Sequence, residues 1–220
     1  VSRDAKALRS GARSNVVSVT KARKMIVGHH VIFGCYGFWL PNDPRGSWSD
    51  FVGAWELFRH GPATKVTERR SLASRPHDRA ARVAAKQSLK YPAVELSEAQ
   101  REAVGKGFAT YFERSRIAVW TCAILPDHVH LVVARPKYSV EKMVIQLKGE
   151  ATQALKEQGI HPLSEWIDEK GKTPKCFARG EWKVFLDPDD VPRAIRYAEG
   201  NPEKEGLPPQ RWGFVTAYPG

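Results

Sequence analysis

The stretch that decides the fold is residues 126–136, which read Pro-Asp-His-Val-His-Leu-Val-Val-Ala-Arg-Pro. Its apolar run between two prolines predicts a short buried strand. Because side chains alternate across a strand, one face carries His128, His130 and Val132, and the other carries Val129, Leu131 and Val133. Two histidines at neighbouring positions of one face are close enough to bind one metal ion. The rest of the chain is interpreted as the surroundings of that ion.

Two helices and three more strands are predicted around this stretch. The strands are expected within residues 25–40, at 116–124 and at 181–186, and the helices at 97–114 and 139–157. The first helix opens with the capping box Ser97-Glu-Ala-Gln100, and both helices have apolar residues at helical spacing. The tight link Leu125-Pro-Asp127 predicts that strand 116–124 and the histidine strand form an antiparallel hairpin.

This order of strand, helix, strand, strand, helix, strand predicts a ferredoxin-like α+β sandwich. We expect a four- to five-stranded antiparallel sheet with two helices on one face. A C-terminal helix that carries Tyr197 is predicted from Asp189 to Gly200, where Asn201-Pro202 stops it. Residues 210–218 are the candidate fifth strand.

The chain is predicted to consist of a basic arm, residues 1–24, and one domain, residues 25–220. Of the 220 residues, 42% are hydrophobic, which is enough for a core. An inserted elaboration is expected at 41–92, with a short helix near 79–89. A small apolar cluster is expected in this insertion from Trp48, Phe51, Trp55, Leu57 and Phe58.

The net charge of +11 is concentrated in two segments. Residues 1–24 hold seven Lys or Arg and one Asp, and residues 59–90 hold nine Lys or Arg and two acidic residues. Two basic segments on a near-neutral body indicate a polyanion partner, most simply nucleic acid. A solvated basic surface is the alternative interpretation.

The cysteines and the hydropathy pattern restrict the compartment. Cys35, Cys122 and Cys176 are scattered, which argues against a disulfide framework or a cysteine zinc site and favours a reducing compartment. No apolar run approaches the roughly 20 residues of a membrane helix, and the basic N-terminal segment has no secretory signal pattern. We expect a cytoplasmic protein without a membrane partner.

A third metal ligand is available in the sequence. Neutral imidazole binds Zn, Mn, Co or Ni well, although a His-x-His pair can also be two hydrogen-bonded core residues. Asn201 follows Tyr197 by four residues. If that turn is helical, the two side chains project from one face, and the amide oxygen of Asn201 completes a three-ligand site.

Tyr197 is the candidate nucleophile. A phenol ionises at about pH 10, but next to a divalent cation it loses its proton more easily and can attack phosphorus. Tyr138 is the rival, because it opens a predicted helix close to the histidine strand. Packing is the alternative role for either ring.

Together these residues resemble the single-tyrosine HUH transposases. The resemblance rests on Pro126-Asp-His-Val-His-Leu-Val, on Leu147-Lys-Gly149 and on Arg196-Tyr-Ala-Glu-Gly-Asn-Pro202. With Lys204-Glu-Gly206 after it, the last motif is most similar to that of the REP-associated tyrosine transposases, and the resemblance covers roughly residues 28–207.

The resemblance implies a function as well as a fold. It implies that His128, His130 and Asn201 bind Mg²⁺ or Mn²⁺, and that Tyr197 forms a 5′-phosphotyrosine on single-stranded DNA at hairpin-forming ends. It also implies a nucleoid-associated protein of the prokaryotic type, either monomer or homodimer.

Single-stranded DNA binding requires positive charge along the backbone and aromatic faces for the bases. The candidates are Arg45, Trp48, Arg135, Lys148 and Arg196, each of which has a surface charge or a packed ring as its alternative role. His29 and His30 are further candidates to reach the metal site.

Two other functions stay open. A non-catalytic binding module for hairpin DNA or RNA predicts salt-sensitive binding and no covalent adduct. A hydrolase that uses His128 and His130 on another phosphoester predicts turnover that is indifferent to Tyr197→Phe.

Overall fold

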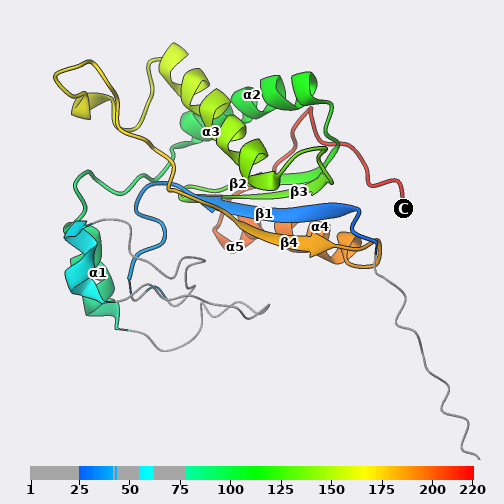
Figure 1. Ribbon diagram of the computed structural model, residues 1–220, viewed down its shortest axis with the longest axis horizontal. Coiled ribbons are helices and arrows are strands. Elements are labelled where there is room, and N and C mark those ends of the chain that lie inside the picture. The colour runs from blue at the N-terminus through cyan, green and yellow to red at the C-terminus, as the bar shows by residue number, and fades with distance from the viewer. Residues whose placement is uncertain (1–24, 42, 44–54, 62–77) are drawn as a thin grey trace, which may run out of the picture.

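Figure 1 shows the computed structural model, which describes residues 25–41, 43, 55–61 and 78–220. The predicted basic arm and Arg45, Trp48 and Phe51 lie outside the described residues. In the described part of the chain, no helix has the length and hydropathy to cross a membrane.

A four-stranded antiparallel sheet forms the centre of the domain. Its strands are β1 (Gly28–Gly34), β2 (Val119–Ile124), β3 (His128–Ala134) and β4 (Trp182–Leu186), in the order β2-β3-β1-β4. The predicted hairpin is present, since β2 pairs with β3 and the amide of Leu125 donates to the carbonyl of His128 at 2.8 Å. The predicted ferredoxin-like α+β class is thereby confirmed.

Two long helices cover one face of the sheet and two short ones lie on the other (Figure 1). The long helices are α2 (Glu98–Ser115) and α3 (Val140–Glu157), and the short ones are α4 (Val191–Glu199) and α5 (Asn201–Lys204). The capping box of α2 is formed as predicted, with Ser97 and Gln100 each bonded to the other's backbone amide.

The main core lies between the sheet and the α2–α3 layer. Val129, Leu131 and Val133 of β3 belong to this core, whereas Val132 belongs to a smaller cluster with residues of α4. The alternation predicted for the histidine strand is therefore confirmed. The two long helices approach closely at Gly107, where a Cβ atom would lie 2.7 Å from the Cα of Ala151.

The predicted end of the last helix is confirmed. α4 ends at Glu199, with Gly200 as its C-cap, directly before Asn201-Pro202. The sequence analysis did not predict the short helix α5, which begins at Asn201 with the proline in its first turn. A proline is tolerated there because the first amides of a helix have no intrahelical acceptor.

The C-terminal tail does not form the candidate fifth strand in the described chain. Val215 makes only an isolated parallel bridge to Val119. Trp212 instead packs over Gly105 of α2, and Phe214 stacks on Phe112 at a ring-centroid distance of 5.5 Å. Aromatic packing onto α2 thus takes the place of further strand pairing.

The insertion contributes a 3-10 helix η1 (Trp55–His60) and a helix α1 (Arg79–Gln87), which lies apart from the sheet (Figure 1). Of the predicted apolar cluster, Leu57 is buried with Leu40 and Ala85. Trp55 and Phe58 are 89% and 64% exposed, so they do not join it.

Candidate active site

Three buried histidines lie on the face of the sheet that α4 covers. His128 and His130 come from β3, and His30 comes from β1, where it is the diagonal neighbour of His130 because His130 pairs with Ile32. All three side chains are less than a tenth exposed. The register between β1 and β3 therefore brings together residues that are 100 positions apart.

The nitrogens of these rings face one another in a definite order. His128 Nε2 lies 3.1 Å from His130 Nε2, and His130 Nδ1 lies 3.1 Å from His30 Nε2. On the far side of His128, its Nδ1 lies 2.6 Å from Oδ1 of Asp127. The ring of Phe38 stacks on His128 at 4.6 Å and closes that side.

The donor set fits a divalent cation between His128 and His130. Two nitrogens that each lie about 2.1 Å from one cation are about 3.0 to 3.4 Å apart, for ligand angles between octahedral and tetrahedral. The two Nε2 atoms are 3.1 Å apart. Among the described residues, no group of three or more His, Cys, Asp or Glu side chains is arranged around one metal position. A third protein ligand would therefore have to be of another type, such as an amide oxygen.

Burial keeps two of the imidazoles uncharged. It lowers the pKa of His30 to about 4. Burial also lowers the pKa of His130 well below its ordinary value, assisted by repulsion from His128, His30 and Lys204. Near neutral pH both rings are in the uncharged form, which is the form that offers a lone pair to a metal.

Tyr197 of α4 lies beside the histidines. Its ring centroid is 5.7 Å from that of His130 and 5.8 Å from that of His30, with both imidazoles nearly edge-on. The residue is 42% exposed, so a substrate can reach it. Lys204 Nζ lies 4.7 Å from the ring centroid, a cation–π distance. Burial raises the pKa of the Tyr197 phenol.

Asn201 is tied to the same turn as Tyr197. Its side-chain amide nitrogen donates to the main-chain carbonyl of Tyr197 at 2.7 Å, and the residue is buried. This bond occupies the nitrogen end of the carboxamide and leaves the oxygen end for another partner. An oxygen donor on α5, next to the nucleophile candidate, is compatible with the ligand role expected for Asn201.

The rival tyrosine lies elsewhere. Tyr138 packs against the main core on the α2–α3 face, where its hydroxyl is hydrogen-bonded to that of Tyr111. The two candidate tyrosines are thus separated by the sheet, and only Tyr197 lies on the histidine face.

The three candidate DNA-binding residues that the structure describes do not gather at one place. Arg196 is exposed next to Tyr197 in α4, and Arg135 is exposed just past the end of β3. Lys148 lies on the α3 side of the sheet, where it donates to the carbonyls of Ala178 and Gly180. Arg45 and Trp48 lie outside the described residues.

Three residues near the site received no role from the sequence. Asp127 and Phe38 contact His128, and Lys204 contacts Tyr197. The position of Asp127 directly before His128 is a signal that could have been used. The contact of Phe38 with His128 depends on the fold alone.

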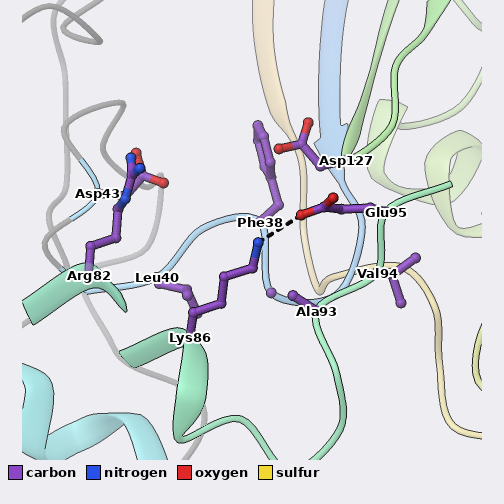
Figure 2. A pocket seen from close by; sticks show the side chains of 10 residues that line it. Phe38, Leu40, Asp43, Arg82, Lys86, Ala93, Val94, Glu95 and Asp127 are labelled. Carbon is purple, nitrogen blue, oxygen red and sulfur yellow. Dashed lines mark hydrogen bonds and ion pairs between the residues drawn. The ribbon is translucent and has the colours of Figure 1, made fainter. Parts of the chain in front are cut away.

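A cavity of about 310 Å³ is lined in part by Phe38 and Asp127, the two residues that contact His128. Figure 2 shows Phe38 and Asp127 on the side near the sheet, with Arg82 and Lys86 of α1 on the opposite side. Lys86 reaches across to Glu95 in an ion pair of 2.8 Å. The insertion helix thereby lines the same cavity as two residues that contact His128.

Comparison with known proteins gives one family match. Residues 88–170 match the family model described as "Transposase IS200 like". This segment contains α2, β2, β3 with His128 and His130, and α3, and it ends before α4. No curated protein matches the chain.

Two solved structures are also similar. One is a REP-associated tyrosine transposase bound to a REP hairpin, with 10% identity and a TM-score of 0.43, covering 91% of this chain and 76% of the other. The second is a protein of Deinococcus radiodurans R1 named as a candidate transposase, with 9% identity and a TM-score of 0.36, covering 88% and 97%. The match of residues 88–170 to the IS200-like family model confirms the predicted resemblance of this chain to the single-tyrosine HUH transposases.

Proposed function

We propose that this protein cuts and rejoins single-stranded DNA at hairpin-forming ends through a covalent bond to Tyr197. The family match supports a DNA-processing role of the transposase type. The finer proposal has its main support in one observation: the ring of the half-exposed Tyr197 lies within 6 Å of two buried imidazole rings, at 5.7 Å from His130 and 5.8 Å from His30.

A divalent cation, Mg²⁺ or Mn²⁺, would be held by Nε2 of His128, Nε2 of His130 and the amide oxygen of Asn201. Such a cation supplies charge stabilisation to the phosphate and the phenolate. The chain's own contribution is to keep His130 neutral by burial and to fix the direction of His128 through Asp127. The distance of 3.1 Å between the two Nε2 atoms supports this ligand pair.

Tyr197 would act as the nucleophile. The phenol loses its proton, its oxygen bonds to phosphorus, and the bond from phosphorus to the 3′ oxygen breaks. The products are a 5′-phosphotyrosine and a 3′ hydroxyl, so the same step in reverse rejoins a strand. Lys204, 4.7 Å from the ring centroid, offsets the negative charge of the phenolate.

Substrate binding would use positive charge near this face of the sheet. Arg196 is exposed on α4 beside Tyr197, and Arg82 and Lys86 line the cavity that Phe38 and Asp127 also line. The weaker candidates are Arg45, Trp48, Arg135 and Lys148. Lys148 is weaker because it already donates to two carbonyls of its own chain. Salt should weaken DNA binding because phosphate contacts release counterions.

The experiment uses a labelled single-stranded DNA hairpin with flanking single strands and Mn²⁺. Wild-type protein should form a covalent adduct that survives denaturing electrophoresis, and Tyr197→Phe should form none. Tyr138→Phe is the matched control, because it removes a hydroxyl from the opposite face of the sheet and should leave adduct formation unchanged.

The outcomes also decide between the alternatives. Tight, salt-sensitive binding without adduct in any divalent metal would support a non-catalytic hairpin-binding module. Turnover that Tyr197→Phe leaves intact would support a hydrolase. An adduct that persists in Tyr197→Phe would remove this residue from the role.

A further inference from the structure

The 3-10 helix η1 of the insertion presents two aromatic rings to solvent. Trp55 is 89% exposed and Phe58 is 64% exposed. A 3-10 helix has three residues per turn, so side chains that are three positions apart lie on the same side of it. Trp55 and Phe58 therefore form an exposed aromatic pair on one side of η1.

Another side of η1 attaches this helix to α1. Leu57 is buried in one cluster with Ala85 of α1. His60 is three positions further along η1, on the side of Leu57, and its Nε2 lies 2.7 Å from Oγ of Ser88. Arg59 donates to the same hydroxyl at 3.0 Å. These contacts fix η1 on α1 while the aromatic pair faces solvent.

The helices η1 and α1 form one packed unit, and this unit is basic. The two helices hold four Arg or Lys residues and one acidic residue, Glu56. The surrounding sequence has the same sign, since residues 59–90 hold nine Lys or Arg and two acidic residues. Exposed apolar side chains that lie together mark a contact surface, and positive charge around them favours a polyanion as the partner.

An aromatic pair on a basic unit has the features that single-stranded DNA requires. Unpaired bases stack on aromatic rings, while Arg and Lys side chains contact the phosphates between them. Bases inside a duplex stack on one another instead. A second copy of this chain fits the surface less well, because a symmetric dimer through this face would bring two basic units together.

Contiguous packing connects the η1–α1 unit to the candidate active site. Leu57 of η1 belongs to one buried cluster with Leu40, and Leu40 lines the same cavity as Phe38. The ring of Phe38 stacks on His128 at 4.6 Å. The unit that carries the aromatic pair is thus joined to the site through Leu40 and Phe38.

We propose that the aromatic pair is a second DNA-contact site, which stacks unpaired bases of the single strand that flanks the hairpin. Arg79 and Arg82 of α1 would contact the phosphates of the same strand. The inference rests on the proposed binding of single-stranded DNA, and it does not depend on the chemistry of Tyr197. Its consequence is that the insertion favours DNA with unpaired flanks over a hairpin without them.

The first test measures the affinity for a hairpin with flanking single strands by fluorescence anisotropy. The parent protein carries Tyr197→Phe and the buffer contains EDTA, so that strand cleavage does not interfere. Trp55→Ala and Phe58→Ala should each lower the affinity about fivefold to a hundredfold, the contribution of stacking one base. Trp55→Tyr keeps a stacking ring and should bind nearly as well as the parent. Phe185→Ala removes a 55% exposed ring from β4 and is the matched control, with no expected effect.

The second test uses DNA whose flanking nucleotides are abasic, which removes the bases and keeps the phosphates. The parent should bind this DNA more weakly than the complete DNA. Trp55→Ala should bind the abasic DNA as tightly as the parent does, because no base is left to stack on the ring. An equal loss in Trp55→Ala on both DNAs would show that the ring does not stack on a base, and would overturn the inference.

Parent affinity in both Trp55→Ala and Phe58→Ala would also overturn the inference, and a changed oligomeric state in these variants would then identify a protein interface. If Trp55→Ala fails to fold, Phe58→Ala and the affinity of the parent for the two DNAs still decide. A protein that shows the stacking but never forms an adduct with Mn²⁺ refutes the proposed chemistry and keeps this inference. Adduct formation together with parent affinity in both variants does the opposite.

Discussion

His29 and His30 are consecutive residues of β1, yet they belong to two different environments. His29 points to the α2–α3 side, makes an edge contact with Phe185, and has a buried Nδ1 without a partner among the described residues. His30 points to the α4 side and is linked to His130. The contrast extends over the whole sheet. One face packs against the main apolar core, and the other has a smaller apolar cluster and carries His30, His128, His130, Tyr197 and Asn201.

One face of the sheet therefore contributes mainly to stability, and the other face carries the candidate active site. The strand period of two residues places neighbouring side chains in layers of opposite character. Substitutions on the α2–α3 face should change the free energy of unfolding and leave the site of each folded molecule intact. Substitutions of the site residues on the α4 face should change metal binding or activity and leave the free energy of unfolding nearly unchanged.

The largest effect on stability is expected from Leu147→Ala. Leu147 is fully buried in α3, and truncation of such a side chain leaves a cavity that lowers the free energy of unfolding by about 2–5 kcal/mol. Urea denaturation measures this change. Mn²⁺ affinity of the folded variant should equal that of the wild type, and a parallel loss of affinity would contradict the separation of the two faces.

On the opposite face, Asp127→Asn should weaken Mn²⁺ binding about tenfold to a hundredfold, because a neutral amide replaces the carboxylate that accepts from His128 Nδ1 and orients the ring. Its effect on unfolding should be smaller than that of Leu147→Ala. Calorimetric titration with Mn²⁺ checks the affinity. Wild-type affinity in Asp127→Asn would show that His128 needs no such partner.

A smaller effect is expected where the two long helices touch. A Cβ at Gly107 would lie 2.7 Å from the Cα of Ala151, so Gly107→Ala should lower the free energy of unfolding by about 1–3 kcal/mol. Gly149→Ala in α3 is the matched control, since nothing lies within 4 Å of its Cβ position. That change should stabilise by about 0.5–1 kcal/mol, and destabilisation by both would argue against helix contact as the cause.

The smallest effect is a dependence of stability on pH that comes from His29. Burial, together with Lys183 and Arg135, lowers the pKa of His29 in the folded protein. Below about pH 6.5 the unfolded chain takes up a proton there that the folded protein does not, so stability falls as the pH falls. His29→Gln should reduce this slope in urea denaturation series, and an unchanged slope would mean that His29 titrates alike in both states.

Sequence patterns predicted the layers because they depend on local periodicity. The period of two in β3 and the helical spacing in α2 and α3 are visible within one segment, and the structure confirms them. The end of α4 before Asn201-Pro202 was also predicted, but the short helix α5 that follows was not, because a proline is compatible with either end of a helix. The contact of His30 with His130 depends on the register of β1 against β3, which no local pattern contains.

The choice between Tyr138 and Tyr197 likewise depends on long-range packing. Tyr138 is close to the histidine strand in sequence and Tyr197 is distant, but only Tyr197 lies on the histidine face. Which side of a sheet a helix covers is decided by long-range packing. The sequence could therefore name the candidates, and the fold was needed to separate them.

The most direct test of the central claim is to identify the residue that becomes bonded to DNA. Wild-type protein is incubated with the single-stranded hairpin and Mn²⁺, the adduct is digested with protease and nuclease, and the modified peptide is sequenced by mass spectrometry. We predict a nucleotide linked through its 5′ phosphate to Tyr197. A modification on Tyr138 or on any other residue would contradict the account.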